Sequence, residues 1–153
     1  MNMFQTVSFR RIYVPDNVRP IVCEVVKCCK PISFLGDLIP ENGTLRCGPE
    51  YLTVRARALA YPKSVGSTVG PYVLYRARKL GTNPAVLMCV EPDILSVTAC
   101  AICDIPLIQI SPEVLGQLTT GSVVMVDFDK CLLHILELDA CHDSRVVQRQ
   151  VQE

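Results

Sequence analysis

The chain has 153 residues, of which 50% are hydrophobic, and its 15 basic residues balance 15 acidic ones. This length suits one domain with a substantial core. Zero net charge, no basic run and no tryptophan argue against a nucleic-acid-binding protein, and the apolar runs are too short to span a bilayer. Because the first residues carry no apolar leader, we expect a cytoplasmic protein with no membrane partner.

The predicted elements alternate between strands and helices along the chain. In order, we expect strands at 6–14, 21–29 and 52–61, a helix at 67–80, a strand at 85–90, a helix at 92–103, a strand at 105–110, a helix start at 111–113, and a hairpin of 122–128 with 131–138. This order predicts a compact β/α domain with a mixed sheet. We divide the chain into an N-terminal extension (1–20), that domain (21–140) and a polar tail (141–153).

Residues 61–75 carry the most informative local pattern. The chain leaves a strand, passes through small residues, and enters a helix for which Ser67 or Thr68 is a suitable cap. Gly66 allows backbone angles that other residues avoid. A helix start of this kind offers N–H donors and partial positive charge, so it can hold an anion or stabilise an alkoxide on Ser67. In an arbitrary protein the ordinary role of Ser67 would be a plain helix cap.

Cysteine is abundant, and the cysteines stand at positions 23, 28, 29, 47, 89, 100, 103, 131 and 141. An odd number without a leader argues against a secreted disulfide framework. The single C-x-x-C, Cys100 to Cys103, lies in an apolar stretch with no second pair at zinc spacing. We therefore expect buried thiols and no metal site. The alternatives are disulfides of the kind found inside hyperthermophiles, and a metal- or cluster-binding set.

The two histidines are poor candidates for catalysis. His134 lies in an apolar strand with no acid–base partner near it in the sequence, and His142 lies in the polar tail. We expect His134 to be a structural residue. The sequence also lacks the common nucleophile-elbow and phosphate-loop motifs.

Five motifs, taken in order, resemble the small subunit of aconitase X enzymes. They are Pro-Ile-Ser-Phe-Leu-Gly at 31–36, Gly-Ser-Thr-Val-Gly at 66–70 with Tyr-Val-Leu-Tyr at 72–75, Asn-Pro-Ala-Val-Leu at 83–87, Ala101 with Asp-Ile-Pro-Leu at 104–107, and Thr-Gly-Ser-Val-Val-Met-Val-Asp at 120–127. The similarity covers roughly residues 22–138. The second motif is most similar to the archaeal phosphomevalonate dehydratase branch of the family.

This resemblance implies a swivelling β/β/α domain like the last domain of aconitase, a mixed sheet or flattened barrel with flanking helices. It also implies a heterodimer with a large subunit, which would carry an iron–sulfur cluster, so that this chain holds no cofactor. The implied reaction is that of a hydro-lyase acting on a small phosphorylated hydroxy acid. It would dehydrate (R)-5-phosphomevalonate to trans-anhydromevalonate 5-phosphate in an archaeal mevalonate pathway for isoprenoids.

The resemblance also implies which residues form the site. Ser67 matches the serine that acts as the catalytic base in this family. The positions that match substrate-binding residues are Ser64, Gly66, Thr68, Phe34 and Gly36.

The chain departs from the family pattern beside the predicted base. Val65 and Ser64 stand where the family usually has a basic residue and a glycine, and Asp37 follows Gly36 where a second glycine is usual. Losing one charge-stabilising donor typically costs about 10²–10³ in rate, and Lys63 is a candidate to supply the missing charge. Two alternatives follow: a non-catalytic swivel paralogue acting as scaffold or regulatory partner, and the small subunit of a cis-3-hydroxy-L-proline dehydratase.

Overall fold

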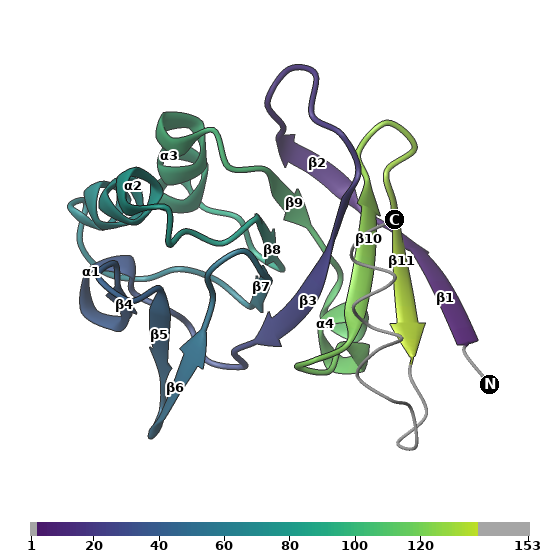
Figure 1. Cartoon of the computed structure of the whole chain (residues 1–153), viewed down its shortest axis with the longest axis horizontal. Helices are drawn as coiled ribbons and strands as arrows, with labels where there is room; N and C mark the ends of the chain where they lie inside the picture. The colour runs from purple at the N-terminus through teal and green to yellow at the C-terminus, as the bar shows by residue number, and fades with distance from the viewer. Residues whose placement is uncertain (1–2, 138–153) are drawn as a thin grey trace.

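The computed structural model describes residues 3–137 of the chain (Figure 1). The strands are β1 (Met3–Ser8), β2 (Arg10–Tyr13), β3 (Ile21–Lys27), β4 (Leu38–Ile39), β5 (Thr44–Cys47), β6 (Glu50–Thr53), β7 (Ala58–Tyr61), β8 (Val86–Cys89), β9 (Leu107–Gln109), β10 (Val123–Asp127) and β11 (Leu132–Glu137). The helices are α1 (Phe34–Asp37), α2 (Gly70–Leu80), α3 (Ile94–Cys103) and α4 (Pro112–Gln117).

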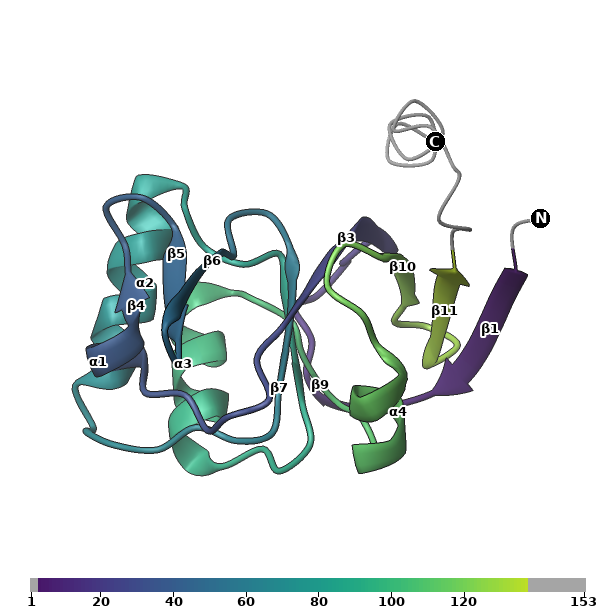
Figure 2. The ribbon, with the colours of Figure 1, turned by 90° about the horizontal axis from the view of Figure 1, so that it is seen from below.

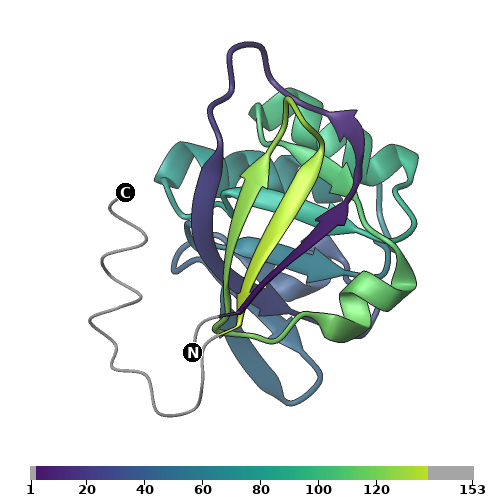
Figure 3. The same ribbon diagram turned by 90° about the vertical axis from the view of Figure 1, so that its right-hand side faces the viewer.

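Eight strands form one mixed sheet in the order β1-β11-β10-β3-β7-β8-β9-β2. The neighbours β3, β7, β8 and β9 run parallel, and the other pairs run antiparallel. Although β1 and β2 stand at opposite ends of this order, only Phe9 separates them in the sequence. The sheet therefore has to curl until its ends meet, and Figure 3 shows β3, β10, β11 and β1 side by side on the curved wall.

The helices and a second, three-stranded sheet (β4-β5-β6) complete the domain. Helices α1, α2 and α3 gather with this small sheet at one end of the molecule (Figures 1 and 2), and α4 lies toward the other end, where Gln5 of β1 donates to Gln117 of α4. No helix within residues 3–137 is long and apolar enough to cross a membrane.

The central parallel strands are buried on both faces and separate two cores. Leu59 and Leu87 point into the core shared with the helices, whereas their neighbours Ala58, Ala60 and Met88 point into the barrel interior. This alternation follows from the strand period of two. Because both faces are covered, β7 and β8 can be apolar throughout, as expected for parallel strands.

Local signals placed several elements correctly. Asp93 caps α3 and accepts a hydrogen bond from the Ser96 amide, and Ser111 caps α4 with Pro112 in its first turn. Gly81 ends α2 in the left-handed region, with φ 73°. The predicted hairpin at the C-terminal end is confirmed as β10 and β11.

The strand predicted at 52–61 is wrong. It is divided by a turn at residues 54–57, where Ala56 has φ 58° and the amides of Val54 and Arg55 both donate to Gly43 O. The turn takes the chain from β6 of the small sheet to β7 of the main sheet. Alternating side chains suit both strands, so the pattern alone did not reveal the break.

The predicted strand at 6–14 is likewise divided, at Phe9, into β1 and β2. These two strands pair with β11 and β9 and so lie within the main sheet, in the stretch that the sequence suggested as an extension. The polar tail at 141–153, with His142, lies outside the described residues.

The expectation of buried thiols holds for four cysteines, which lie in the two cores: Cys23, Cys89, Cys100 and Cys103. It is wrong for Cys28 and Cys47, which form a disulfide between the end of β3 and the end of β5. Cys29 is an exposed free thiol. No local pattern indicates this pairing, because residues 28 and 47 meet only through the small sheet.

Candidate functional site

The loop that carries Ser67 joins β7 to α2 and lies on the surface. The helix begins at Gly70, three residues later than predicted, and Val69 at its N-cap position makes no side-chain capping bond. Ser67 is therefore not the cap. Its Oγ instead accepts a hydrogen bond from the Val69 amide at 3.1 Å, and its carbonyl accepts one from the Gly70 amide at 3.0 Å.

These contacts favour negative charge on Ser67 Oγ. An N–H donor to that oxygen stabilises an alkoxide more than a neutral hydroxyl, and the positive end of α2 follows within three residues. The amides of Gly66, Ser67 and Thr68 donate to no other group in residues 3–137. This exposed loop therefore offers N–H donors to an anion bound beside the serine.

The turn at α1 forms the wall next to this loop. A methyl group added at Gly66 would lie 2.9 Å from Ser33 Oγ, and Gly66 has φ 105°. Both the close approach and the backbone angle require glycine here. On the other side, a methyl group at Gly70 would come within 3.4 Å of Phe34 Cβ. The α1 turn and the start of α2 are thus in close contact around Ser67.

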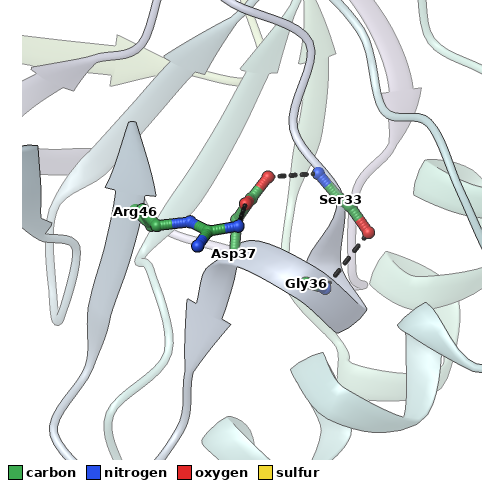
Figure 4. Close-up of polar contacts among 4 residues, drawn as sticks. All are labelled: Ser33, Gly36, Asp37 and Arg46. Atoms are coloured by element: carbon green, nitrogen blue, oxygen red, sulfur yellow. Dashed lines mark hydrogen bonds and ion pairs between the residues drawn. The ribbon is translucent and has the colours of Figure 1, made fainter. Parts of the chain in front are cut away.

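A small polar cluster fixes the α1 turn (Figure 4). Ser33 Oγ accepts from the Gly36 amide at 3.2 Å, and Asp37 Oδ2 accepts from the Ser33 amide at 2.9 Å. The second Asp37 oxygen lies 3.5 Å from an Arg46 guanidinium nitrogen on β5. This reciprocal arrangement is a variant of the capping box, and it holds the Ser33 side chain toward Gly66.

A chain of hydroxyls supports the loop from below. Ser64 Oγ donates to Asp93 Oδ1 at 2.7 Å, Ser96 Oγ donates to Ser64 Oγ at 3.0 Å, and the Tyr61 hydroxyl lies 3.0 Å from Ser96 Oγ. Burial raises the pKa of Tyr61 well above its usual value, so this hydroxyl stays protonated. Each buried polar group has a partner, which makes the base of the loop rigid.

The structure brings together most of the residues that the sequence suggested for the site. Ser67, Gly66, Thr68 and Gly36 are exposed on the two facing turns. The side chains of two other predicted residues point elsewhere. Phe34 is 3% exposed and packs edge-on against Tyr61, and Ser64 is 5% exposed and bonded to Asp93.

Sequence reasoning missed four residues that shape the site: Ser33, Asp37, Asp93 and Ser96. Asp93 lies at the start of the helix predicted at 92–103, and Asp is a common N-cap residue, so its capping role had a local signal. The contact of Ser33 with Gly66 had none, because the two residues are brought together by the pairing of Ile32 with Ser64.

The surroundings of the loop are apolar. Large hydrophobic side chains are exposed around it: Leu35, Val65, Val69, Tyr72 and Ile94. Val65 occupies the position at which a basic residue was expected, and it is 44% exposed. Lys63 is also exposed.

The chain itself offers little to a metal ion. Within the part that the structure describes, no three His, Cys, Asp or Glu side chains lie together as a ligand set. Cys100 and Cys103 are buried in the core, and burial raises the pKa of the Cys103 thiol to about 11. His134 is half-buried and bonded to Thr6 Oγ1 through its Nδ1 atom at 2.9 Å.

Comparisons with known proteins point in one direction. Residues 14–135 match the aconitase X swivel domain family. A phosphomevalonate dehydratase small subunit from Thermococcus kodakarensis is 34% identical over 117 residues, which cover 74% of this chain and 86% of that protein. One from Methanopyrus kandleri is 38% identical over 119 residues, covering 72% of this chain and 85% of that protein.

Solved structures agree with these sequence matches. The crystal structure of Thermococcus kodakaraensis aconitase X in its holo-form matches with a TM-score of 0.76 at 31% identity, covering 87% of this chain and 99% of that one. The solution NMR structure of a UPF0107 protein matches with a TM-score of 0.74 at 28% identity, covering 87% of this chain and 100% of that one.

Proposed function

The chain belongs to the aconitase X swivel domain family, and we propose that Ser67 is the base with which it acts in a dehydration reaction. It is the small subunit of an aconitase X-type dehydratase, and a large subunit is its partner. The proposal rests on the position of Ser67, which is exposed in the loop just before the positive end of α2. Its Oγ accepts a hydrogen bond from the Val69 amide.

In the proposed reaction, Ser67 Oγ first loses its own proton to solvent and then takes a proton from the carbon next to the one that carries the hydroxyl group. A double bond forms between these two carbons, and the hydroxyl group leaves with a proton from solvent as water. The Val69 amide and the α2 terminus stabilise the alkoxide that must form first. The amides of Gly66 to Thr68 donate to no other backbone group in residues 3–137 and suit an anionic group of the substrate. The rigid support beneath Ser64 holds these donors in place and so lowers the entropic cost of reaching the reactive geometry.

The proposed substrate is (R)-5-phosphomevalonate, because the named relatives across several archaea are phosphomevalonate dehydratase small subunits. Its product would be trans-anhydromevalonate 5-phosphate. A carboxylate or phosphate on this substrate would meet the amide donors of the loop. We assign the iron–sulfur cluster expected for this family to the large subunit, because the described residues here provide no ligand set for it.

The apolar rim of the loop supports docking of the large subunit at this face. Large exposed apolar side chains on a monomer commonly mark a protein interface. Here they surround the only hydroxyl to which we give a catalytic role, so that a partner seated on Leu35, Val69 and Tyr72 would also close the reaction space over Ser67.

The test is reconstitution of the chain with its large subunit and an assay on phosphomevalonate. Ser67→Ala should lower kcat by about 10²–10⁴, the range for loss of a general base. Its folding should be unaffected, since Ser67 is exposed. The matched control is Thr119→Ala, an exposed hydroxyl at the other end of the molecule, which should retain the parental rate. Parental turnover by Ser67→Ala would end the assignment of the base. A parental complex inert on phosphomevalonate would instead favour a scaffolding role or another hydroxy acid.

A further inference from the structure

The Cys28–Cys47 disulfide encloses the segment that forms one wall of the site. The bond joins residues 19 apart, and between them lie the α1 turn, β4 and most of β5. We propose that this disulfide is a redox-sensitive clasp: when it is closed it holds the α1 turn against the Ser67 loop, and its reduction by a dithiol lowers the activity of the assembled enzyme. The part of this proposal that concerns activity rests on the proposed function.

A continuous series of contacts connects the disulfide to the site. Arg46 precedes Cys47 on β5, and a nitrogen of its guanidinium lies 3.5 Å from Asp37 Oδ1. Asp37 Oδ2 accepts a hydrogen bond from the Ser33 amide (Figure 4). A methyl group added at Gly66 would lie 2.9 Å from Ser33 Oγ. Gly66 is the immediate neighbour of Ser67. A shift of β5 at Cys47 is therefore passed on through three contacts to the predicted base.

The segment is anchored at two places, but few contacts join the α1 turn to β5. Ile32 pairs with Ser64, and β5 pairs with β6 over four residues. Between the α1 turn and β5, the Arg46–Asp37 pair is a surface ion pair with the arginine side chain 54% exposed, and pairs of this kind contribute little to stability. Reduction should consequently leave the segment folded and paired through Ile32, while the part of the turn from Ser33 to Asp37 can shift against Gly66.

The disulfide is accessible to a reductant from one side. It borders a pocket of about 270 Å³ that is also lined by Lys30, Arg46 and Gly48. Cys28 is 1% exposed, whereas Cys47 is half-buried, so Cys47 Sγ is the sulfur open to attack. Asp37 also lines this pocket and pairs with Arg46, so Lys30 is the cationic side chain that favours the approach of a thiolate, which is the attacking form in thiol–disulfide exchange.

The chemical step is an ordinary exchange. A thiolate of the dithiol attacks Cys47 Sγ, the Cys28–Cys47 bond breaks, and Cys28 leaves as a thiolate that takes a proton from solvent. The second thiol of the reductant then displaces Cys47 from the mixed disulfide. Two electrons pass to the protein, which gains two thiols, and the dithiol becomes a cyclic or intramolecular disulfide.

The first experiment uses the full chain alone and needs no activity. The chain purified without reductant should gain 2 Da on treatment with dithiothreitol, with the change confined to the peptides containing Cys28 and Cys47. Hydrogen exchange should then become faster in residues 33–37 and 64–69 and stay unchanged in β10 and β11. Free thiols at both positions before treatment, or equal exchange in both redox states, would overturn the clasp.

The second experiment uses the reconstituted complex in one buffer, so that the partner's cluster meets the same conditions throughout. Cys28→Ala/Cys47→Ala should lower kcat about tenfold, because a small displacement of a reacting group is costly in rate. Cys29→Ser, which removes the exposed neighbouring thiol, should match the parent. If the double variant fails to fold, the dithiol-treated parent, repurified before assay, provides the same comparison.

The outcomes separate the two proposals. A double variant as active as the parent overturns the clasp and leaves the proposed function standing. A parental complex with no turnover overturns the proposed function, and the exchange experiment then decides the clasp by itself.

Discussion

The two ends of this molecule are built differently. At the helical end, α1 to α3, the small sheet and β2 surround one core, and at the barrel end β1, β10, β11 and α4 surround the other. The large hydrophobic side chains exposed in the described residues all belong to the helical end: Leu35, Tyr51, Val65, Val69, Tyr72, Tyr75, Leu80, Ile94 and Ile102. The barrel end is closed on itself, whereas the helical end has the composition of a surface that meets other molecules.

The polar contacts follow the same division. At the helical end, hydrogen bonds of Ser33, Asp37, Ser64 and Asp93 converge on one loop. At the barrel end, contacts such as that between Thr6 and His134 link neighbouring strands and lead to no shared feature. We conclude that the barrel end provides stability and the helical end provides the site, although both share β3, β7, β8 and β9.

The largest expected effects come from the two cores. Leu133→Ala at the barrel end and Leu74→Ala at the helical end each remove a fully buried side chain and should each cost about 2–5 kcal/mol of unfolding free energy. Because β3, β7, β8 and β9 each contribute residues to both cores, each variant should still unfold in one transition, monitored by circular dichroism in urea. Two separate transitions would mean that the ends are independent domains.

A large effect on rate is expected at Val65, which stands where the family usually has a basic residue. Val65→Lys should raise kcat of the reconstituted complex by up to about 10², because it returns a charge beside the Ser67 alkoxide. Val65→Met is the matched control, since it adds length without charge and should leave kcat unchanged. An equal gain in both variants would show that packing rather than charge limits the rate.

Helix caps allow a direct comparison of the two ends. Asp93→Ala should cost about 1–3 kcal/mol, because it removes the α3 cap and the acceptor to which the Ser64 hydroxyl donates. It should also lower kcat. Ser111→Ala at the barrel end should cost about 1 kcal/mol through loss of the α4 cap, with kcat unchanged. Urea titration and steady-state assays check both variants, and a fall in kcat for Ser111→Ala would contradict the division between the ends.

The smallest effects concern thiol reactivity, which should depend on burial rather than on the end of the molecule. Burial raises the pKa values of Cys23, Cys89 and Cys103 to about 11, so these thiols stay protonated at pH 8. At pH 8 only about one in a thousand copies of each of these thiols would be in the reactive thiolate form. Brief alkylation followed by peptide mass spectrometry should therefore label Cys29 first. The buried thiols should react appreciably only as the pH approaches 11, and fast labelling of Cys89 at pH 8 would contradict this prediction.

The sequence determined the features that depend on neighbours along the chain. The residues at 111–113 marked a helix start, the helix predicted to end at residue 80 ends there, and the apolar run at 85–90 marked a buried strand, because caps and side-chain periods act within a few residues. The ordered motifs also identified the family correctly. Ser67 came from that family match, and its catalytic role stays a prediction.

Only the tertiary structure decided the features that join distant segments. These are the closure of the sheet through Phe9, the turn at Ala56, the pairing of Cys28 with Cys47, and the contact of Ser33 with Gly66. The inward direction of Ser64 belongs with them, since it depends on Asp93 from another element. The physical reason is that these contacts are stabilised by residues far apart in the sequence. Local propensities do not specify which distant residues come into contact.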